Sequence, residues 1–262
     1  MKRLLLILLA GIVVGTPVLA QDDKLDDLSF EEMPLKDEAI PYFAVGVGPV
    51  VTFGFPDLAD VNRVGAQLAT GSQTGTSGLS DLKSPMVLAG AEIFTAIGIV
   101  PNLRVGFSWI TGSSQATTDV TVGGTPATRT LEYGLGLRTI HIDYAWVPFK
   151  SFSVLPGVGL GWGTQSINYF QGFKGSRDLG NFNTPPDVFA QLERSILYVA
   201  PRLNVEYALA PFLLVRAQAG YSIQASGSDW KGNRTTVITG VPDGIKAQNF
   251  SAQIGLFVGL FN

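Results

Sequence analysis

Apolar and polar residues alternate with a period of two along much of this chain, most clearly in its last segment. One side of that segment carries Asn249, Ser251, Gln253, Gly255 and Gly259, and the other is entirely apolar: Phe250, Ala252, Ile254, Leu256, Val258 and Leu260. The segment 213–224 repeats the pattern. Alternation with period two is typical of a β-strand whose two faces meet different environments. We therefore predict a strand in each segment.

The same pattern predicts eight strands, near 40–53, 85–99, 103–111, 127–147, 152–167, 195–209, 213–224 and 249–260. Short connections contain Pro101, Pro148 or Pro211, and the connections between them, near 54–84, 112–126, 168–193 and 225–245, are long and polar. Tight turns at one end and long loops at the other are typical of outer-membrane barrels, whose strand number is even. The predicted fold is all-β: a transmembrane up-and-down antiparallel β-barrel of about eight strands, with short periplasmic turns and long extracellular loops.

A helical membrane span is the alternative, and the sequence disfavours it. The best helical segment, Met86 to Val100, has Glu92 near its middle and is rich in glycine and β-branched residues. It is also shorter than the roughly 20 residues that a span requires. Strands therefore remain the expected membrane-spanning elements.

Composition and the N-terminal segment indicate export to a membrane. Residues 1–20 combine Lys2 and Arg3, an apolar run, and small residues at Val18 and Ala20, as in a cleaved signal peptide. We expect an acidic periplasmic leader at 21–39 and the transmembrane barrel at 40–262. Only 15% of the residues are charged, whereas 31 are glycine and 16 are phenylalanine. So apolar a composition favours the bacterial outer membrane as the location.

Charge and cysteine content exclude several classes of function. Without Lys2 and Arg3 the chain has 16 basic and 21 acidic residues, a formal charge of −5, and no basic cluster. This argues against a nucleic-acid partner. The absence of cysteine excludes a disulfide scaffold and a thiolate metal site. We expect no cofactor and no metal.

With its strand count and its alternation of turns and loops, the segment Ile40 to Asn262 resembles the small outer-membrane barrels of the OmpA transmembrane domain, OmpX and OmpW type. The resemblance is architectural. The last strand departs from that group, because its terminal aromatic position is occupied by Asn262 and Phe261 falls on the other face. What the resemblance implies is a membrane barrel handled by the outer-membrane assembly machinery and surrounded by outer-membrane lipids and lipopolysaccharide.

The alternation changes phase within 127–147. Leu131, Tyr133, Leu135 and Leu137 form one apolar series, and Ile140, Ile142, Tyr144 and Trp146 form another of opposite parity. A bulge near Arg138 and Thr139 would turn both series toward lipid. On that interpretation the barrel encloses a lumen charge network of Glu92, Arg104, Glu132, Arg138, His141, Asp143, Arg202, Glu206 and Arg216, together with Asn204 and Gln253.

Two functions of these inward charges stay open. An eight-stranded barrel is only wide enough for its own side chains, so the charges either pair as a structural plug or line a path for a solute. Glycines at 46, 48, 134, 136, 157, 159, 161 and 163 would remove bulk from the lumen in either case.

His141 is the single histidine, and Asp143 lies two residues away on the same strand face. A carboxylate can orient an imidazole for catalysis, and some small barrels deacylate lipid A with a histidine and a serine nucleophile. No serine stands out beside His141. We therefore expect no catalytic residue, and a hydrogen-bonded histidine in the lumen.

Aromatic residues near the strand ends are typical of interfacial girdles: Trp109, Tyr144, Trp146, Trp162, Tyr207 and Tyr221. In the first long loop, Leu58, Val61, Val64 and Leu68 have helical spacing after Pro56 and Asp57. We predict a short amphipathic helix there, at the extracellular mouth.

The favoured function is a non-enzymatic outer-membrane barrel with a structural or surface-interaction role. The alternative is a narrow channel or carrier for small solutes, apolar ones included, and a lipid A-modifying hydrolase is a third. A periplasmic or surface partner has no signature in the sequence.

Overall fold

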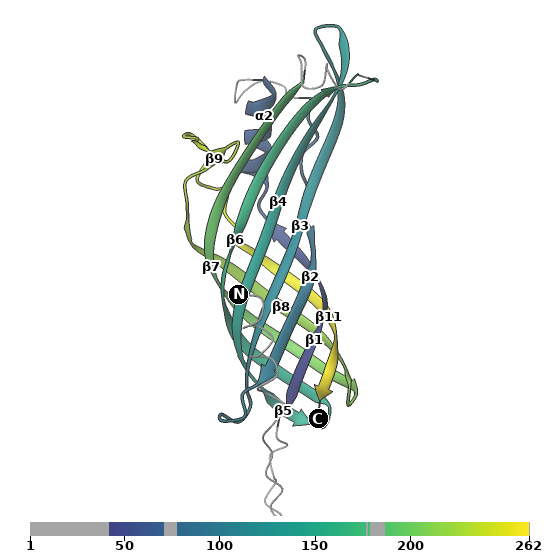
Figure 1. Ribbon diagram of the computed structural model, residues 1–262, viewed down its shortest axis with the longest axis vertical. Coiled ribbons are helices and arrows are strands. Elements are labelled where there is room, and N and C mark those ends of the chain that lie inside the picture. Colours follow the sequence, from purple (N-terminus) through teal and green to yellow (C-terminus); the bar gives the residue numbers. More distant parts are fainter. Residues whose placement is uncertain (1–41, 71–77, 177, 179–186, 262) are drawn as a thin grey trace, which may run out of the picture. The chain divides into compact units, whose positions relative to one another are not determined.

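The computed structural model describes residues 42–70, 78–176, 178 and 187–261. Eight long antiparallel strands form a closed ring (Figure 1): β1 (Ala44–Pro56), β2 (Met86–Ala96), β3 (Leu103–Val122), β4 (Thr125–Tyr144), β6 (Phe152–Phe173), β7 (Val188–Ala210), β8 (Leu213–Gly227) and β11 (Asn249–Phe261). Each of the eight pairs with its neighbours along the chain, and β11 pairs with β1 to close the ring. The predicted eight-stranded up-and-down barrel is confirmed.

Four short elements lie in the connections: helix α2 (Ala59–Thr70), β5 (Trp146–Phe149), β9 (Lys231–Gly232) and β10 (Thr236–Val237). Within the described residues, no helix combines the length and the apolar character of a membrane span. The predicted signal peptide at 1–20 and leader at 21–39, and the terminal residue Asn262, lie outside the described residues.

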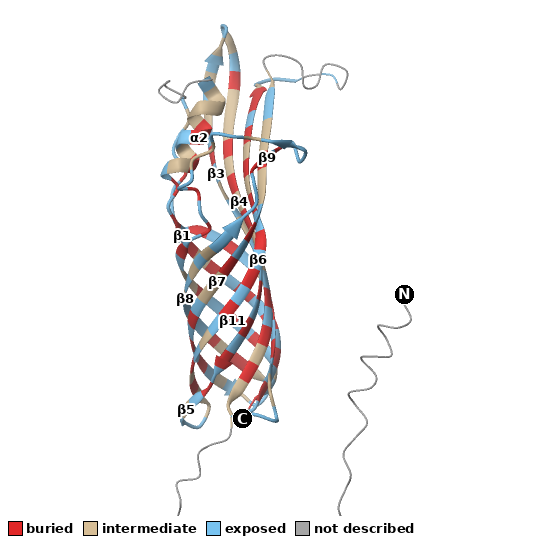
Figure 2. Cartoon of the chain, turned by 90° about the vertical axis from the view of Figure 1, so that its left-hand side faces the viewer, coloured by how far each residue is buried: buried red, intermediate tan, exposed pale blue. Residues whose placement is uncertain are grey.

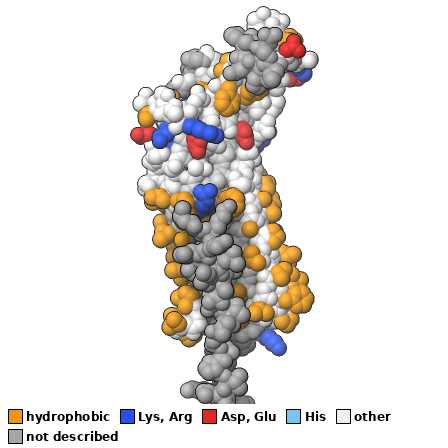
Figure 3. All heavy atoms as spheres, viewed as in Figure 1, with side chains coloured by type: hydrophobic (Ala, Val, Ile, Leu, Met, Phe, Trp, Pro, Cys, Tyr) orange, Lys and Arg blue, Asp and Glu red, His pale blue; other side chains and the backbone are white. Residues whose placement is uncertain are grey.

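The half of the barrel nearest the tight turns carries an apolar outer surface. Side chains along its strands alternate between buried and exposed (Figure 2), and the exposed ones are large and apolar, such as Leu160 at 64%, Ile254 at 63% and Val258 at 59% exposure. Figure 3 shows this belt in orange, ending well below the upper rim. So extensive an apolar surface on a closed barrel is the surface that faces lipid.

Four of the strands continue past this belt. β3, β4, β6 and β7 have 20, 20, 22 and 23 residues, whereas β1, β2, β8 and β11 have 11 to 15. The prediction of a loop at 112–126 was wrong, because β3 and β4 remain paired up to a two-residue turn at Gly123 and Gly124, both with positive φ. β6 and β7 likewise extend into the predicted loop 168–193. Outside a membrane both faces of a strand can carry polar side chains. The strands therefore stay paired in segments where apolar and polar residues no longer alternate.

The predicted bulge in β4 was also wrong. The register of β4 with β3 and with β6 is continuous through Arg138 and Thr139, so the strand keeps one parity along its whole length. Leu131 to Leu137 therefore face inward together with His141 and Asp143, and Glu132 and Arg138 face outward. The apolar series changes parity along β4 because the surroundings of the strand change. In the lower half of the barrel, which is the half nearest the tight turns, lipid lies outside. In the upper half, an apolar core lies inside.

Helix α2 supplies one side of that upper core. The carboxylate of Asp57 accepts a hydrogen bond from the Ala59 amide at the start of the helix, 3.0 Å away. Val61 and Val64 are buried. Around them pack inward-facing residues of the long strands and of the loop before β11, including Leu131, Tyr133, Leu135, Ile167, Leu192, Trp230 and Ile245. The predicted loop helix is present, and it fills the barrel's upper interior.

Candidate functional site

Six buried charges form a closed ring inside the lower half of the barrel. They alternate in sign: Arg104, Asp143, Arg202, Glu92, Arg216 and Glu206, returning to Arg104. Every arginine contacts two carboxylates, and every carboxylate contacts two arginines. The formal charge of the ring is therefore 3 − 3 = 0.

Five of the six contacts have the geometry of charge-assisted hydrogen bonds, and the contact of Arg202 with Asp143 is an ion pair alone. Arg104 Nη2 lies 2.6 Å from Asp143 Oδ2, and Arg216 Nε lies 2.6 Å from Glu206 Oε1. Arg202 closes the ring less tightly, at 3.2 Å from Glu92 and 3.4 Å from Asp143. Arg104 with Glu206, and Arg216 with Glu92, complete the cycle. Such pairs are stable in a dry interior only when both partners are present.

Five strands bring the ring together. Glu92 comes from β2, Arg104 from β3 and Asp143 from β4, while β7 supplies Arg202 and Glu206 and β8 supplies Arg216. Arg104 and Asp143 are direct cross-strand partners, as are Glu206 and Arg216. The contacts of Glu92 with Arg202 and Arg216 instead cross the lumen, between strands that are not adjacent. Closure of the barrel is what creates these cross-lumen pairs.

His141 bridges two of the carboxylates. Its Nε2 lies 3.1 Å from Glu92 Oε1, and its Nδ1 lies 3.1 Å from Asp143 Oδ2. The ring atoms of His141 are fully buried. Both nitrogens therefore face carboxylates, and the contact of Nδ1 with Asp143 has the geometry of a hydrogen bond.

Side chains on both sides extend the ring into a larger polar layer. Tyr42 donates to Glu206 at 3.1 Å and accepts from Arg104 at 3.1 Å. Gln253 donates to Glu92 at 3.3 Å and accepts from Thr52 at 2.8 Å. These contacts satisfy carboxylate oxygens and guanidinium groups that the ion pairs alone would leave unfilled.

An aromatic floor lies against the ring on the side of the tight turns. The Arg216 guanidinium stacks 4.3 Å from the centroid of Phe94 and 4.2 Å from that of Phe257, and Arg104 lies 4.6 Å from Phe94. Phe94 also contacts Phe257 edge-on and lies near Phe261. Cation–π contacts of this kind stabilise arginines that have left water.

The inward glycines make room for these side chains. A Cβ at Gly157 would lie 1.9 Å from Asp143 Oδ1, one at Gly161 would lie 2.1 Å from the Tyr198 ring, and one at Gly106 would lie 2.3 Å from His141. Gly134 and Gly136 face outward on β4, so they do not thin the lumen. Neighbouring side chains thus already occupy most of the space next to the glycines of β6.

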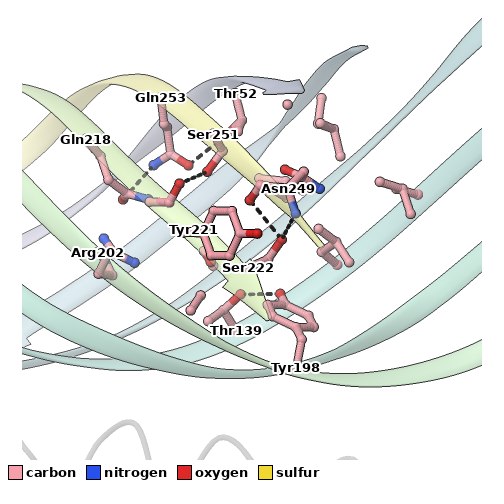
Figure 4. Close-up of a pocket in the computed structure, with 18 residues that line it drawn as sticks. Thr52, Thr139, Tyr198, Arg202, Gln218, Tyr221, Ser222, Asn249, Ser251 and Gln253 are labelled. Atoms are coloured by element: carbon pink, nitrogen blue, oxygen red, sulfur yellow. Dashed lines mark hydrogen bonds between the residues drawn. The ribbon is translucent and has the colours of Figure 1, made fainter. Parts of the chain in front are cut away.

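A small cavity of mixed polarity lies between the ring and the upper apolar core (Figure 4). Its volume is about 70 Å³, and its lining combines Arg202 with hydroxyl and amide side chains and a few leucines. Several of these groups bond to one another: Thr139 with Tyr198 at 2.6 Å, and Ser222 with the Asn249 backbone. A cavity of this size has room for a few water molecules next to its polar groups.

Seven of the nine charged residues predicted for the lumen lie in the ring or bridge it: Glu92, Arg104, His141, Asp143, Arg202, Glu206 and Arg216. Glu132 and Arg138 do not, because β4 keeps its register and turns them outward. Tyr42, Phe94 and Phe257 were missed. Phe94 has the same parity as Glu92, and Phe257 has the same parity as Gln253, so the sequence alone indicated that both face inward. Tyr42 gave no such signal, because it precedes the alternating part of its strand.

The aromatic residues predicted at the interfaces all lie on the outer surface. Their exposed fractions range from 39% for Trp162 to 62% for Trp146. Trp109 and Trp162 lie where the apolar belt gives way to polar residues, and Tyr144, Trp146 and Tyr207 lie near the tight turns. The two levels correspond to the two edges of the belt.

No family model and no curated protein matches the sequence. Three solved outer-membrane barrels have similar folds. Ail, the attachment invasion locus protein of Yersinia pestis, is 9% identical with a TM-score of 0.40, over 84% of this chain and 99% of that one. CarO of Acinetobacter baumannii is 12% identical with a TM-score of 0.38, over 84% and 98%.

The third is a major outer membrane protein from Thermus thermophilus, 13% identical with a TM-score of 0.43, over 83% of this chain and 100% of that one. At these identities the similarity concerns the fold alone. In fold, the chain resembles the small outer-membrane β-barrel proteins of bacteria.

Proposed function

We propose that this protein is a closed, non-enzymatic barrel of the bacterial outer membrane, which anchors a surface-exposed wall of strands. The observation that carries the proposal is the ring of charges. Each of its three arginines and three carboxylates is paired twice, so the ring presents no uncompensated charge to a passing ion.

Two further layers support closure. The aromatic floor of Phe94, Phe257 and Phe261 lies on one side of the ring, and the apolar core with helix α2 lies on the other. A solute would have to displace both layers and break ion pairs that cost about 3–5 kcal/mol when one partner is lost. Such a barrel is suited to anchoring rather than to transport.

The wall formed by β3, β4, β6 and β7 supports a role at the cell surface. These strands exceed their shorter neighbours by roughly eight residues, or about 25 Å at the usual rise of a strand. Most of their outward side chains above the belt are polar, including Thr111, Ser113, Thr164 and Ser195, whereas Phe170 and Phe189 are exposed near the strand ends. A rigid polar wall outside the membrane can contact other molecules at the surface, while the barrel serves as its base.

The arrangement around His141 argues against the hydrolase alternative. A histidine that acts as general base needs one nitrogen free to accept a proton from a nucleophile. Both nitrogens of His141 instead face carboxylates, at 3.1 Å each. We therefore assign His141 to the ring and not to catalysis.

The cavity above the ring favours a second candidate, a narrow channel or carrier. It adjoins Arg202, the most loosely held arginine of the ring, whose Nε has no hydrogen-bond partner within the described residues. A movement of Arg202 would join the cavity to the space around the ring. Its volume of about 70 Å³ limits this candidate to very small solutes.

Conductance of the refolded full chain in planar lipid bilayers separates the two candidates. A closed barrel gives silent bilayers, whereas steady single-channel conductance would overturn our proposal. As a positive control, the variant Arg216→Ser/Glu206→Ser/Phe257→Ala removes two ring charges, with the three ion pairs that they form, and part of the floor together. We expect it to conduct, which shows that silence of the unmodified protein is not a failure of insertion.

A further inference from the structure

Arg138 lies between two tryptophans on the outer surface of the barrel. Its direct cross-strand partners are Trp109 on β3 and Trp162 on β6. All three side chains are exposed, the tryptophans at 56% and 39%. Tryptophan at the edge of an apolar belt marks the level where lipid tails end and headgroups begin. Arg138 is therefore held at headgroup depth.

Above Arg138, two adjoining depressions continue along the outside of β7. The first, about 320 Å³, is lined by Arg138, Thr164, Ser195 and Ser228 and by the apolar residues Trp162, Ile196 and Leu197. The second, about 340 Å³, shares Ser195 and Ser228 with it and adds Lys231, Arg234 and Glu193. The Ser228 amide donates to the Ser195 carbonyl at 2.9 Å, which fixes the boundary between the two. We call this continuous depression the β7 groove.

The β7 groove has a positive balance. Arg138, Lys231 and Arg234 oppose Glu193, so its formal charge is 3 − 1 = +2. None of the three cations forms an ion pair with a carboxylate in the part of the chain that the structure describes. Arg194 also lines the groove, but its guanidinium turns inward to Gln165 and to the face of Trp230.

The turn that presents Arg234 is strained. β9 pairs with β7 just above the end of β8 (Figure 1), and the turn after β9 is closed by a hydrogen bond from Thr235 to Gly232. Asn233 and Arg234 occupy its centre with φ of 47° and 69°. Asparagine and glycine are the residues that suit such a turn, and an arginine there costs about 1 kcal/mol. Strain of this kind is retained where the side chain has a use.

We propose that the β7 groove binds the phosphorylated saccharide headgroup of a glycolipid in the outer leaflet. Two tryptophans set its depth, its serines and threonine are hydrogen-bond partners for sugar hydroxyls, and its three cations match a phosphate of charge −1.5 to about −2. This inference deepens the proposed function and rests on its placement of the barrel in the outer membrane. It assigns the class of lipid that would fix the orientation of the protein in the membrane.

Lipid retention measured by native mass spectrometry tests the groove. The refolded full chain is reconstituted in phosphatidylcholine vesicles containing bis-phosphorylated lipid A, extracted in mild detergent, and scored for bound lipid A. The variants are Arg138→Gln, Lys231→Gln and Arg234→Gly, singly and together. Lys150→Gln is the matched control, because Lys150 is an exposed cation in the tight turn at the opposite end.

We expect each single substitution to lower lipid A affinity about fivefold, and the free-energy losses to add in the combined variant. The control should leave the affinity unchanged. Dephosphorylated lipid A should be retained no better than phosphatidylcholine. Arg234→Gly should also raise the stability of the turn, which separates lost binding from lost folding.

Equal retention by the triple variant and the unmodified protein would overturn the site. Displacement of lipid A by millimolar inorganic phosphate would show a site for free anions only, and would also overturn the assignment to a glycolipid. Failure of the proposed function would be recognised separately, because it would appear as conductance in the bilayer experiment. The lipid-retention measurement does not depend on that result.

Discussion

Arg216 donates from Nε to Oε1 of Glu206 at 2.6 Å, in the middle of the barrel and with both side chains buried. The same guanidinium also contacts Glu92 and stacks on Phe94 and Phe257. Arg216 therefore joins the ring of charges to the aromatic floor.

Replacing Arg216 with methionine should destabilise the barrel severely. Glu206 and Glu92 would each lose one of two cations in a buried site, and a broken buried pair costs about 3–5 kcal/mol. Urea unfolding of the refolded protein in vesicles, followed by tryptophan fluorescence, measures the loss. The matched substitution Lys150→Met in the exposed tight turn should change stability by no more than about 0.5 kcal/mol. Equal effects of the two would contradict the ring.

Removing both members of the pair should cost less than the sum of the single substitutions. In Arg216→Met/Glu206→Met, two arginines and two carboxylates remain, so the ring stays neutral. We expect a coupling energy above about 1 kcal/mol from the double-mutant cycle. If the free-energy losses of the two single substitutions simply add in the double variant, the contact between Arg216 and Glu206 contributes no stability of its own.

His141→Ala separates a structural histidine from a catalytic one. Asp143 would lose a buried hydrogen-bond partner and Glu92 a buried polar contact, which lowers stability by about 1–3 kcal/mol. Mass spectrometry of lipid A from cells that express the variant should show the acyl pattern of cells with the unmodified protein. A changed acyl pattern would restore the hydrolase hypothesis.

Gly65 allows helix α2 to approach β4 closely. A Cβ at this position would lie 2.4 Å from Leu131 Cδ2, so Gly65→Val should push the helix out of the upper core. Overpacking of this kind costs about 1–3 kcal/mol. Limited proteolysis within 57–70 should become faster, while the exposed substitution Arg63→Ala should leave it unchanged. Adding Leu131→Ala should reduce the effect of Gly65→Val, and a lack of any such rescue would place the clash elsewhere.

Much of the fold follows from local pattern. A strand such as 249–261 meets lipid on one face and the lumen on the other, so its alternation predicts both the strand and the side that Ile254 presents. The prolines at 101, 148 and 211 mark tight connections for equally local reasons. The hairpin tip at Gly123 and Gly124 was missed, although two glycines after a run rich in threonine and valine are a local signal for it.

The parity of Leu131 and Arg138 is a different matter. Period-two alternation says that two faces differ, but not which face is inside, and along β4 the apolar face changes from outward to inward. That change depends on where the membrane ends and on helix α2 filling the upper interior. Neither is encoded in the strand itself, so the sequence suggested a bulge where the strand is regular.

By itself, the sequence determined an apolar, eight-stranded chain and the residue types available to its lumen, because these depend on composition and on a two-residue period. Only the tertiary structure decided that the lumen charges form a neutral ring. Contacts such as Glu92 with Arg216 join strands that are not adjacent in the barrel, across 124 residues of chain. Their existence depends on closure of the barrel, on its diameter and on the stagger of its strands, none of which a local pattern specifies.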